Sequence, residues 1–297
     1  MESTKVNLIT ILRDRVGELC SDGNFAEAKH CANAAVEKAE KELSSDVDSI
    51  EAFASALEVR GDLLRSMGEM EAARDDYKQS IDQLEGRLDL SAQLGRLHAG
   101  LGAVHDELGN VPLTIELWEQ ALYFFEKAQP PAPLDVASLS NNIAFLKKSL
   151  GDTDGAENAF LKALEIMHRV LGQSHDETAC VCNNLGALYQ QSGYYEQARE
   201  MHLMALDARK KSFGENHLDT AQSYNNLALA LIKTGDPALA KRNFEFALNS
   251  LEACGPDAID EIQSVCDNYL DFLREDGSDG FANLIQERVK DAIARWS

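Results

Sequence analysis

Apolar residues recur along the chain at helical spacing, in pairs of amphipathic segments that a short polar turn separates. Each turn carries a glycine, and the intervals between these glycines are 45, 41, 42, 42, 42 and 42 residues. The turn glycines are Gly23, Gly68, Gly109, Gly151, Gly193, Gly235 and Gly277. A glycine suits the left-handed conformation that ends a first helix, and Asp236 followed by Pro237 is typical of the start of a second one. The pattern predicts a helical hairpin repeated along the chain.

Side-chain size recurs in phase with the turn glycines. Most repeats have a small residue seven positions before the glycine, an alanine five positions after it and a large residue nine positions after it. The large residues include Tyr77, Trp118, Phe160, His202 and Phe244. Interlocking hairpins require such an alternation of large and small side chains. We therefore predict an all-α fold, an α-solenoid in which each hairpin buries its apolar face against the next.

The repeats are predicted to form one array over residues 1–297. Six hairpins are expected at roughly 1–40, 41–85, 86–127, 128–169, 170–211 and 212–253, with a degenerate capping hairpin at 254–297. An apolar stripe at helical spacing is expected to close the last core; it comprises Phe281, Leu284, Ile285, Val289, Ile293 and Trp296. The proline cluster at 130–133 is expected to be a loop and not a domain boundary.

Composition and charge narrow the classes of partner. Fifty acidic and twenty-eight basic residues give a formal net charge of −22, which repels nucleic acid and anionic lipid surfaces. No stretch approaches the roughly 20 apolar residues that a membrane span needs. Charged residues near the start interrupt any signal-peptide pattern, and the six cysteines form no C-x-x-C pair. We expect a cytoplasmic protein with reduced thiols and no nucleic-acid or membrane partner.

Motifs that carry catalysis or bind cofactors are not found in the sequence. There is no glycine-rich phosphate loop after a strand, no G-x-S-x-G elbow and no H-E-x-x-H helix. The seven histidines have scattered phases, apart from His175 and His217, which recur in the loops between repeats and are expected to pack or cap helices there. We predict no enzymatic activity, no cofactor and no metal, and an undetected enzymatic role is kept as a remaining alternative.

Four segments of the fifth and sixth repeats closely resemble the tetratricopeptide repeat (TPR) of kinesin light chains. They are Val-Leu-Gly-Gln-Ser-His at 170–175, Asn-Asn-Leu-Gly-Ala-Leu-Tyr at 183–189, Phe-Gly-Glu-Asn-His at 213–217 and Asn-Asn-Leu-Ala at 225–228. The resemblance is tightest from Asp135 to about Cys254 and implies a right-handed TPR superhelix. Kinesin light chains have a heptad segment before the repeats, whereas the first repeat here begins almost at Met1. The chain is therefore more similar to the stand-alone bacterial kinesin-light-chain-like proteins, some of which accompany bacterial tubulins.

The resemblance also implies a binding site, because in this family asparagines on the first helices of a concave groove bind the backbone of extended peptides. The matching asparagines are Asn142, Asn184 and Asn226, with Asn141, Asn183 and Asn225 beside them. Groove positions that flank them are Arg96, Lys148, Gln190, Gln191, Gln222 and Lys233. The alternative is that the asparagines bond neighbouring helices and hold the repeats in register. The second and third repeats lack the pair, which places the expected site in the C-terminal half.

The expected function is that of a non-catalytic scaffold that binds a protein partner through the groove. The most specific hypothesis is a bacterial tubulin-like filament as the partner. The alternative is an adaptor that binds short linear peptides of cargo or signalling proteins. The sequence does not determine the oligomeric state, and a monomer is favoured.

Overall fold

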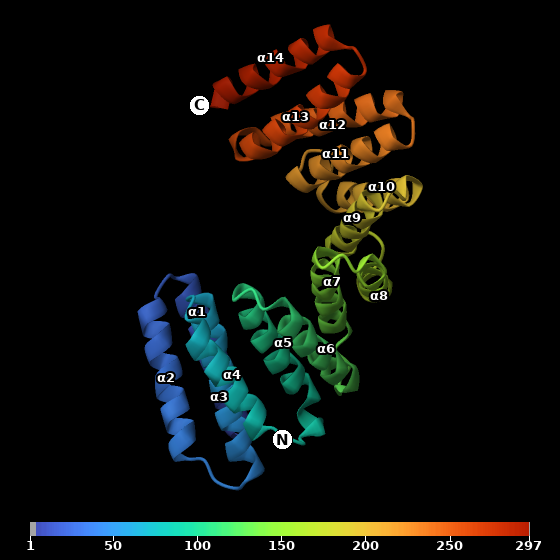
Figure 1. Cartoon of the computed structure of the whole chain (residues 1–297). Coiled ribbons are helices and arrows are strands. Elements are labelled where there is room, and N and C mark those ends of the chain that lie inside the picture. Colours follow the sequence, from blue (N-terminus) through green and yellow to red (C-terminus); the bar gives the residue numbers. More distant parts are fainter. Residues whose placement is uncertain (1–3, 297) are drawn as a thin grey trace. The chain divides into compact units, whose positions relative to one another are not determined.

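The computed structural model describes residues 4–296, with side chains from Ile11 onwards. Within this range the chain has fourteen α-helices and two short 3₁₀ helices. It divides into two compact units, unit one (Met1–Leu139) and unit two (Ser140–Ser297), which are described separately. The all-α fold of sequential hairpins is confirmed, whereas the continuity of one superhelical array across both units stays a prediction (Figure 1).

Unit one contains three hairpins. They are α1 (Thr4–Ser21) with α2 (Phe25–Lys41), α3 (Val47–Ser66) with α4 (Met70–Gln83), and α5 (Ser91–Glu107) with α6 (Val111–Lys127), with the 3₁₀ helix η1 (Leu88–Leu90) before α5. The proline cluster lies in the connection to α7 (Pro133–Ser149), and Pro133 is the first residue of that helix. The division between the units falls within α7.

Unit two continues with the same arrangement. After α7 come α8 (Thr153–Leu171), α9 (Asp176–Gln191) with α10 (Tyr195–Phe213), α11 (Leu218–Lys233) with α12 (Pro237–Cys254), η2 (Gly255–Ala258), and α13 (Ile259–Glu275) with α14 (Asp279–Trp296). The aromatic rings of Phe145 and Phe160 pack edge to face at 5.3 Å, which joins α7 to α8. No helix in the described part of the chain is long and apolar enough to cross a membrane.

The turns and helix starts follow the predicted local chemistry. All seven turn glycines have positive φ, between 72° and 82°, so the predicted left-handed position is confirmed. Asp236 caps α12 by accepting a hydrogen bond from the backbone N–H of Leu239 at 3.1 Å. His175 and His217 cap α9 and α11, because each Nδ1 accepts from a backbone N–H two residues further on, at 3.3 Å and 3.2 Å. The capping role predicted for these two histidines is confirmed.

The alternation of small and large residues sets how closely the two helices of a hairpin approach. A Cβ atom added at Gly102 would lie 2.3 Å from Trp118, and one added at Gly186 would lie 2.7 Å from the His202 ring. Both glycines stand seven positions before their turn glycine, and both rings stand nine positions after it. The ring of one helix therefore lies against the bare backbone of the other, which only a small residue permits.

The last hairpin is a complete structural unit. Ile285 and Val289 are buried against α13, and Ile293 and Trp296 pack partly buried on the same cluster. The prediction for Leu284 was wrong, because this side chain is 60% exposed. Phe281 is 43% exposed, although its ring packs edge to face on Tyr269 of the core at 6.3 Å. The buried face of α14 consists of residues three or four positions apart, and the full buried set is Ala282, Ile285, Val289 and Ala292. Phe281 and Leu284 each precede a member of that set by one residue, which turns them about 100° away.

Candidate functional site in unit two

The asparagine pairs stand ten and nine positions before the turn glycines, on the first helices of their hairpins. The two members of a pair differ in burial. Asn183 and Asn225, the first members on α9 and α11, are 9% and 8% exposed, whereas Asn184 and Asn226 are half-buried. The first member therefore points into the packing between helices, and the second lies closer to the surface.

Two of these amides form bonds between successive repeats with one common pattern. Asn184 Nδ2 donates to Asn141 Oδ1 at 3.0 Å, and Asn268 Nδ2 donates to Asn225 Oδ1 at 3.2 Å. In both cases the second-position amide donates to the first-position carbonyl of the preceding repeat. These four amides hold neighbouring first helices together, as the structural alternative predicted. Asn268 was missed from the sequence, although it stands nine positions before Gly277 and so has the phase of a second member.

The step from α9 to α11 departs from this pattern because of a histidine on α10. His202 Nδ1 lies 3.1 Å from Asn183 Oδ1, and Asn183 Nδ2 donates to Ser223 Oγ at 3.4 Å. Since the amide nitrogen of Asn183 is directed at Ser223, its oxygen is the acceptor and His202 Nδ1 carries the hydrogen, a tautomer assigned from the hydrogen-bond network. Burial lowers the pKa of His202 to about 4, so the ring is neutral at pH 7. Its Nε2 is therefore a hydrogen-bond acceptor.

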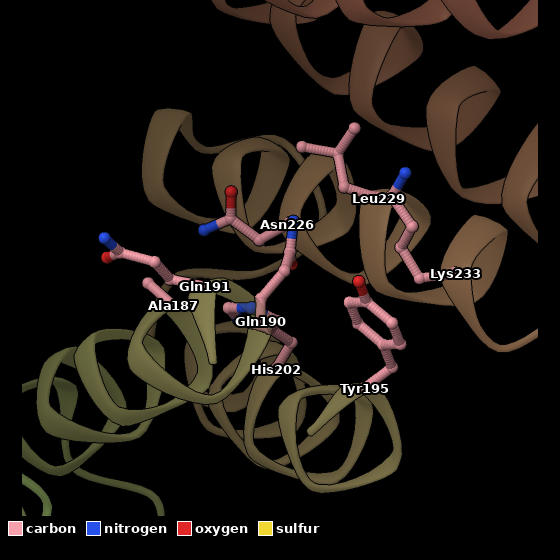
Figure 2. Close-up of a pocket in the computed structure, with 8 residues that line it drawn as sticks. All are labelled: Ala187, Gln190, Gln191, Tyr195, His202, Asn226, Leu229 and Lys233. Carbon is pink, nitrogen blue, oxygen red and sulfur yellow. The ribbon is translucent and has the colours of Figure 1, made fainter. Parts of the chain in front are cut away.

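At this step the Asn183 carbonyl is bonded to His202, and the amide of Asn226 does not donate to it. Asn226 stands where Asn184 and Asn268 stand in their repeats, yet its side chain makes no hydrogen bond to any other described residue. Its side chain lies instead on a cleft of about 360 Å³ formed by α9, α10 and α11, which Figure 2 shows in close-up. The cleft is lined by Ala187, Gln190, Gln191, Tyr195, His202, Asn226, Leu229 and Lys233.

Four of the predicted groove residues converge in this cleft (Figure 2): Gln190, Gln191, Asn226 and Lys233. Gln190 and Gln191 come from the last turn of α9, and Lys233 is the last residue of α11. None of the four side chains has a hydrogen bond or ion pair with another described residue. Their amide and ammonium groups are therefore available to a ligand.

Other predicted residues are not brought to the cleft. Asn142 is exposed on α7 and accepts from Asn141 Nδ2 at 3.4 Å, Lys148 is half-buried at the end of the same helix, and Gln222 is exposed in the first turns of α11. These three residues belong to unit two but are not among the residues that line the cleft.

Arg96 belongs to unit one, where it takes part in an ion-paired bridge. The carboxylate of Glu58 on α3 is buried, and it accepts from Arg96 Nε at 2.7 Å and Gln93 Nε2 at 2.9 Å. Arg13 Nη2 on α1 lies 3.2 Å from the same carboxylate. Glu58 stands ten positions before its turn glycine, the place of the first asparagine in unit two. A buried carboxylate therefore links three first helices in unit one where amides link them in unit two.

The electrostatic character of the cleft differs from that of the chain as a whole. Lys233 is the one charged side chain among the lining residues, and His202 is neutral. The residues from 201 to 250 contain five acidic and six basic side chains, although the whole chain carries a net charge of −22. In the described residues no group of three or more His, Cys, Asp or Glu side chains could hold a metal ion. The cleft offers neutral polar groups and one cation.

Comparison with known sequences shows the class to which the chain belongs. A tetratricopeptide repeat profile matches residues 135–211 and 177–253, and a second one matches residues 54–83, so that together they cover half of the chain. The chain belongs to the tetratricopeptide repeat family, whose members are protein–protein interaction domains and typically non-catalytic binding scaffolds. Among curated protein sequences there is no significant match.

Solved structures with a similar fold include three repeat proteins. BtubC (BKLC) from P. vanneervenii has a TM-score of 0.65 and 25% sequence identity, covering 77% of this chain and 92% of that chain. The C-terminal part of a TPR repeat-containing protein from Cytophaga hutchinsonii has a TM-score of 0.66 at 14% identity, covering 96% and 95%. The TPR-like repeats of a Podosopora anserina putative kinesin light chain have a TM-score of 0.55 at 16% identity, covering 66% and 93%. The latter two similarities show the fold alone.

Proposed function

We propose that this TPR protein is a non-catalytic scaffold that binds an extended segment of a partner protein at the cleft of α9, α10 and α11. The observation that supports the proposal is the convergence there of Gln190, Gln191 and Asn226, whose amides are unpaired. Each primary amide offers both a donor and an acceptor, and can therefore bind a peptide unit whatever its side chain. At the equivalent position of two other repeats in unit two, Asn184 and Asn268 are engaged between repeats.

For the partner, we propose a bacterial tubulin-type filament, to which the protein binds as an accessory component. Two observations support this more specific proposal. The repeats from Asp135 to Cys254 resemble those of kinesin light chains and their bacterial counterparts, and the structure is similar to BtubC (BKLC) at 25% identity. The net charge of −22 is compatible with a protein partner and unfavourable for a nucleic acid.

The filament proposal is tested by cosedimentation with assembled bacterial tubulin filaments. We expect the wild-type chain to pellet with the filaments at low salt, and Asn226→Ala combined with Lys233→Ala to reduce the pelleted fraction. Gln222→Ala is the matched control, because Gln222 lies on the same helix, is exposed and does not line the cleft. If the wild-type chain stays in the supernatant at low salt, the filament is not the partner. If the control and the double variant reduce pelleting equally, the cleft is not the contact.

The second candidate function is an adaptor that grips a short linear peptide without contacting a filament. The size of the cleft favours it, because about 360 Å³ lies at the lower end of the ~300–1,000 Å³ that ligand pockets occupy. Such a volume accommodates a short stretch of extended chain. A peptide array separates the two candidates, since a linear motif keeps its affinity when it is excised from its protein and a folded filament surface does not.

A further inference from the structure

His202 occupies a position that is aromatic in the neighbouring hairpins. The equivalent residues in the hairpins before and after it are Phe160 and Phe244, and both are fully buried. A phenyl ring has no N–H or O–H group, so it cannot donate a hydrogen bond to an amide carbonyl. In those two hairpins the first-position carbonyls of Asn141 and Asn225 consequently accept from the asparagine of the next repeat. The step from α9 to α11 differs in three buried residues that form one hydrogen-bond network with Asn183, namely His202, Ser223 and Arg209, and of these only His202 lines the cleft.

The second ring nitrogen of His202 faces the cleft. Its Nε2 makes no hydrogen bond within the described residues, and it is not among their buried polar atoms without a partner, which are Arg65 Nε and His105 Nε2. His202 is only 2% exposed, and it lines the cleft, so what is accessible of the ring is reached through the cleft. The nitrogen is therefore an acceptor at the base of the cleft, fixed by the bond that Nδ1 makes to Asn183.

We infer that His202 is the specificity-determining residue of this cleft, and that it selects an uncharged hydrogen-bond donor on the extended partner segment. The inference rests on the proposed function of the cleft as a peptide-binding site. An acceptor that is buried and unpaired in the complex costs free energy, so a segment that fails to donate to it binds less tightly. Discrimination of this kind, against a ligand that lacks the hydrogen-bonding group, is stronger than discrimination by shape alone.

The charge of the cleft determines which donors are accepted. Lysine and arginine side chains are also donors, but they would bring a second cation next to the Lys233 ammonium. No carboxylate is among the lining residues to compensate for it. Uncharged donors such as the amides of Asn and Gln, the hydroxyls of Ser, Thr and Tyr and the indole N–H of Trp do not meet this repulsion.

The inference is tested with a positional-scanning library of immobilised extended peptides, in which one residue at a time is fixed. At one position the wild-type chain should retain donors about tenfold better than their shape-matched non-donors, for example Gln over Met and Tyr over Phe, and should also disfavour Lys and Arg. His202→Phe removes the acceptor and restores the ring type of Phe160 and Phe244. It should lose this preference and retain peptides more weakly, because Asn226 is then able to donate to the Asn183 carbonyl, as Asn184 and Asn268 do in their repeats. Equal rankings for wild type and His202→Phe overturn the inference and leave the peptide-binding function standing, whereas no retention by either protein overturns both.

A measurement on the wild-type chain keeps the test independent of whether the variant folds. In protein labelled with ¹⁵N-histidine, the best-retained library peptide should shift the Nε2 resonance of His202 and leave Nδ1 bonded to Asn183. His175, which caps α9 and does not line the cleft, is the internal control. A bound peptide that leaves the Nε2 resonance of His202 unchanged contradicts the proposed contact.

Discussion

The buried imidazole of His202 makes the stability of unit two depend on pH in a defined way. Burial lowers its pKa from 6.5 to about 4. In the unfolded chain the ring recovers its ordinary pKa, so between pH 4 and 6.5 the unfolded state binds more protons than the folded state. Stability from this residue is therefore fully present above pH 6.5 and is lost as the pH falls towards 4.

The magnitude follows from the two pKa values. A shift from 6.5 to about 4 corresponds to a loss of about 3 kcal/mol once the pH is below both values, and about 2 kcal/mol of it falls between pH 7 and pH 5. Other groups titrate in the same range, so the wild-type change alone does not isolate His202. The His202→Phe variant has no titrating group at this position and serves as the reference, and the prediction concerns the difference between the two proteins.

Urea unfolding followed by tryptophan fluorescence measures this difference. The chain has two tryptophans, and in a Trp118→Phe background the remaining one, Trp296 on α14, reports on unit two. The wild type should lose about 2 kcal/mol more than His202→Phe between pH 7 and pH 5. Equal pH dependence in the two proteins, or an NMR titration that places the pKa of His202 near 6.5, would refute both the burial argument and the neutral tautomer inferred from it.

Two further predictions concern the hairpins of unit one. Gly102→Ala should destabilise the chain by about 1–3 kcal/mol in urea unfolding, because its Cβ would lie 2.3 Å from Trp118, whereas Gly17→Ala, at an exposed helical site with nothing within 4 Å, should stabilise it by about 0.5–1 kcal/mol. An equal effect of the two substitutions would contradict the packing argument. Glu58→Gln should cost about 1–3 kcal/mol, because it removes the charge that the two half-exposed arginines share, and raising the salt concentration should change that cost only slightly.

The hairpin repeat could be predicted from the sequence because each of its signature positions has a single steric solution. A residue at a φ near 80° is almost always glycine, and a ring that lies on bare backbone demands a small residue opposite it. These constraints act within one hairpin, so the residues that satisfy them recur once in every repeat. The exposure of Phe281 and Leu284 was not predictable in the same way, because α14 has apolar residues on two adjacent faces and only the packing against α13 decides between them.

The candidate site was only partly predictable, because it depends on which bond each asparagine makes. Asn184 and Asn226 both stand nine positions before their turn glycine, so they are equivalent as far as the sequence can show. In the structure Asn184 is engaged between repeats and Asn226 lines a cleft. The corresponding carbonyl of Asn183 is bonded instead to His202, which lies 19 residues further along the chain. The sequence does show a histidine at a position that is aromatic in both neighbouring hairpins. What this histidine bonds to depends on a contact between α9 and α10, which the sequence does not show.

Within each unit polar bridges join successive first helices, and the residues that form a bridge determine which groups remain for a partner. In unit one the carboxylate of Glu58 occupies Arg13 and Arg96, which are then not free to recognise an anion. At two steps of unit two the surface asparagines form the bridge themselves. Between α9 and α11 the bridge consists of the buried residues His202, Ser223 and Arg209, and the side chain of Asn226 takes no part in it. A binding site at this step therefore does not compete with the bonds that hold the repeats together, which is the physical reason for placing the partner there.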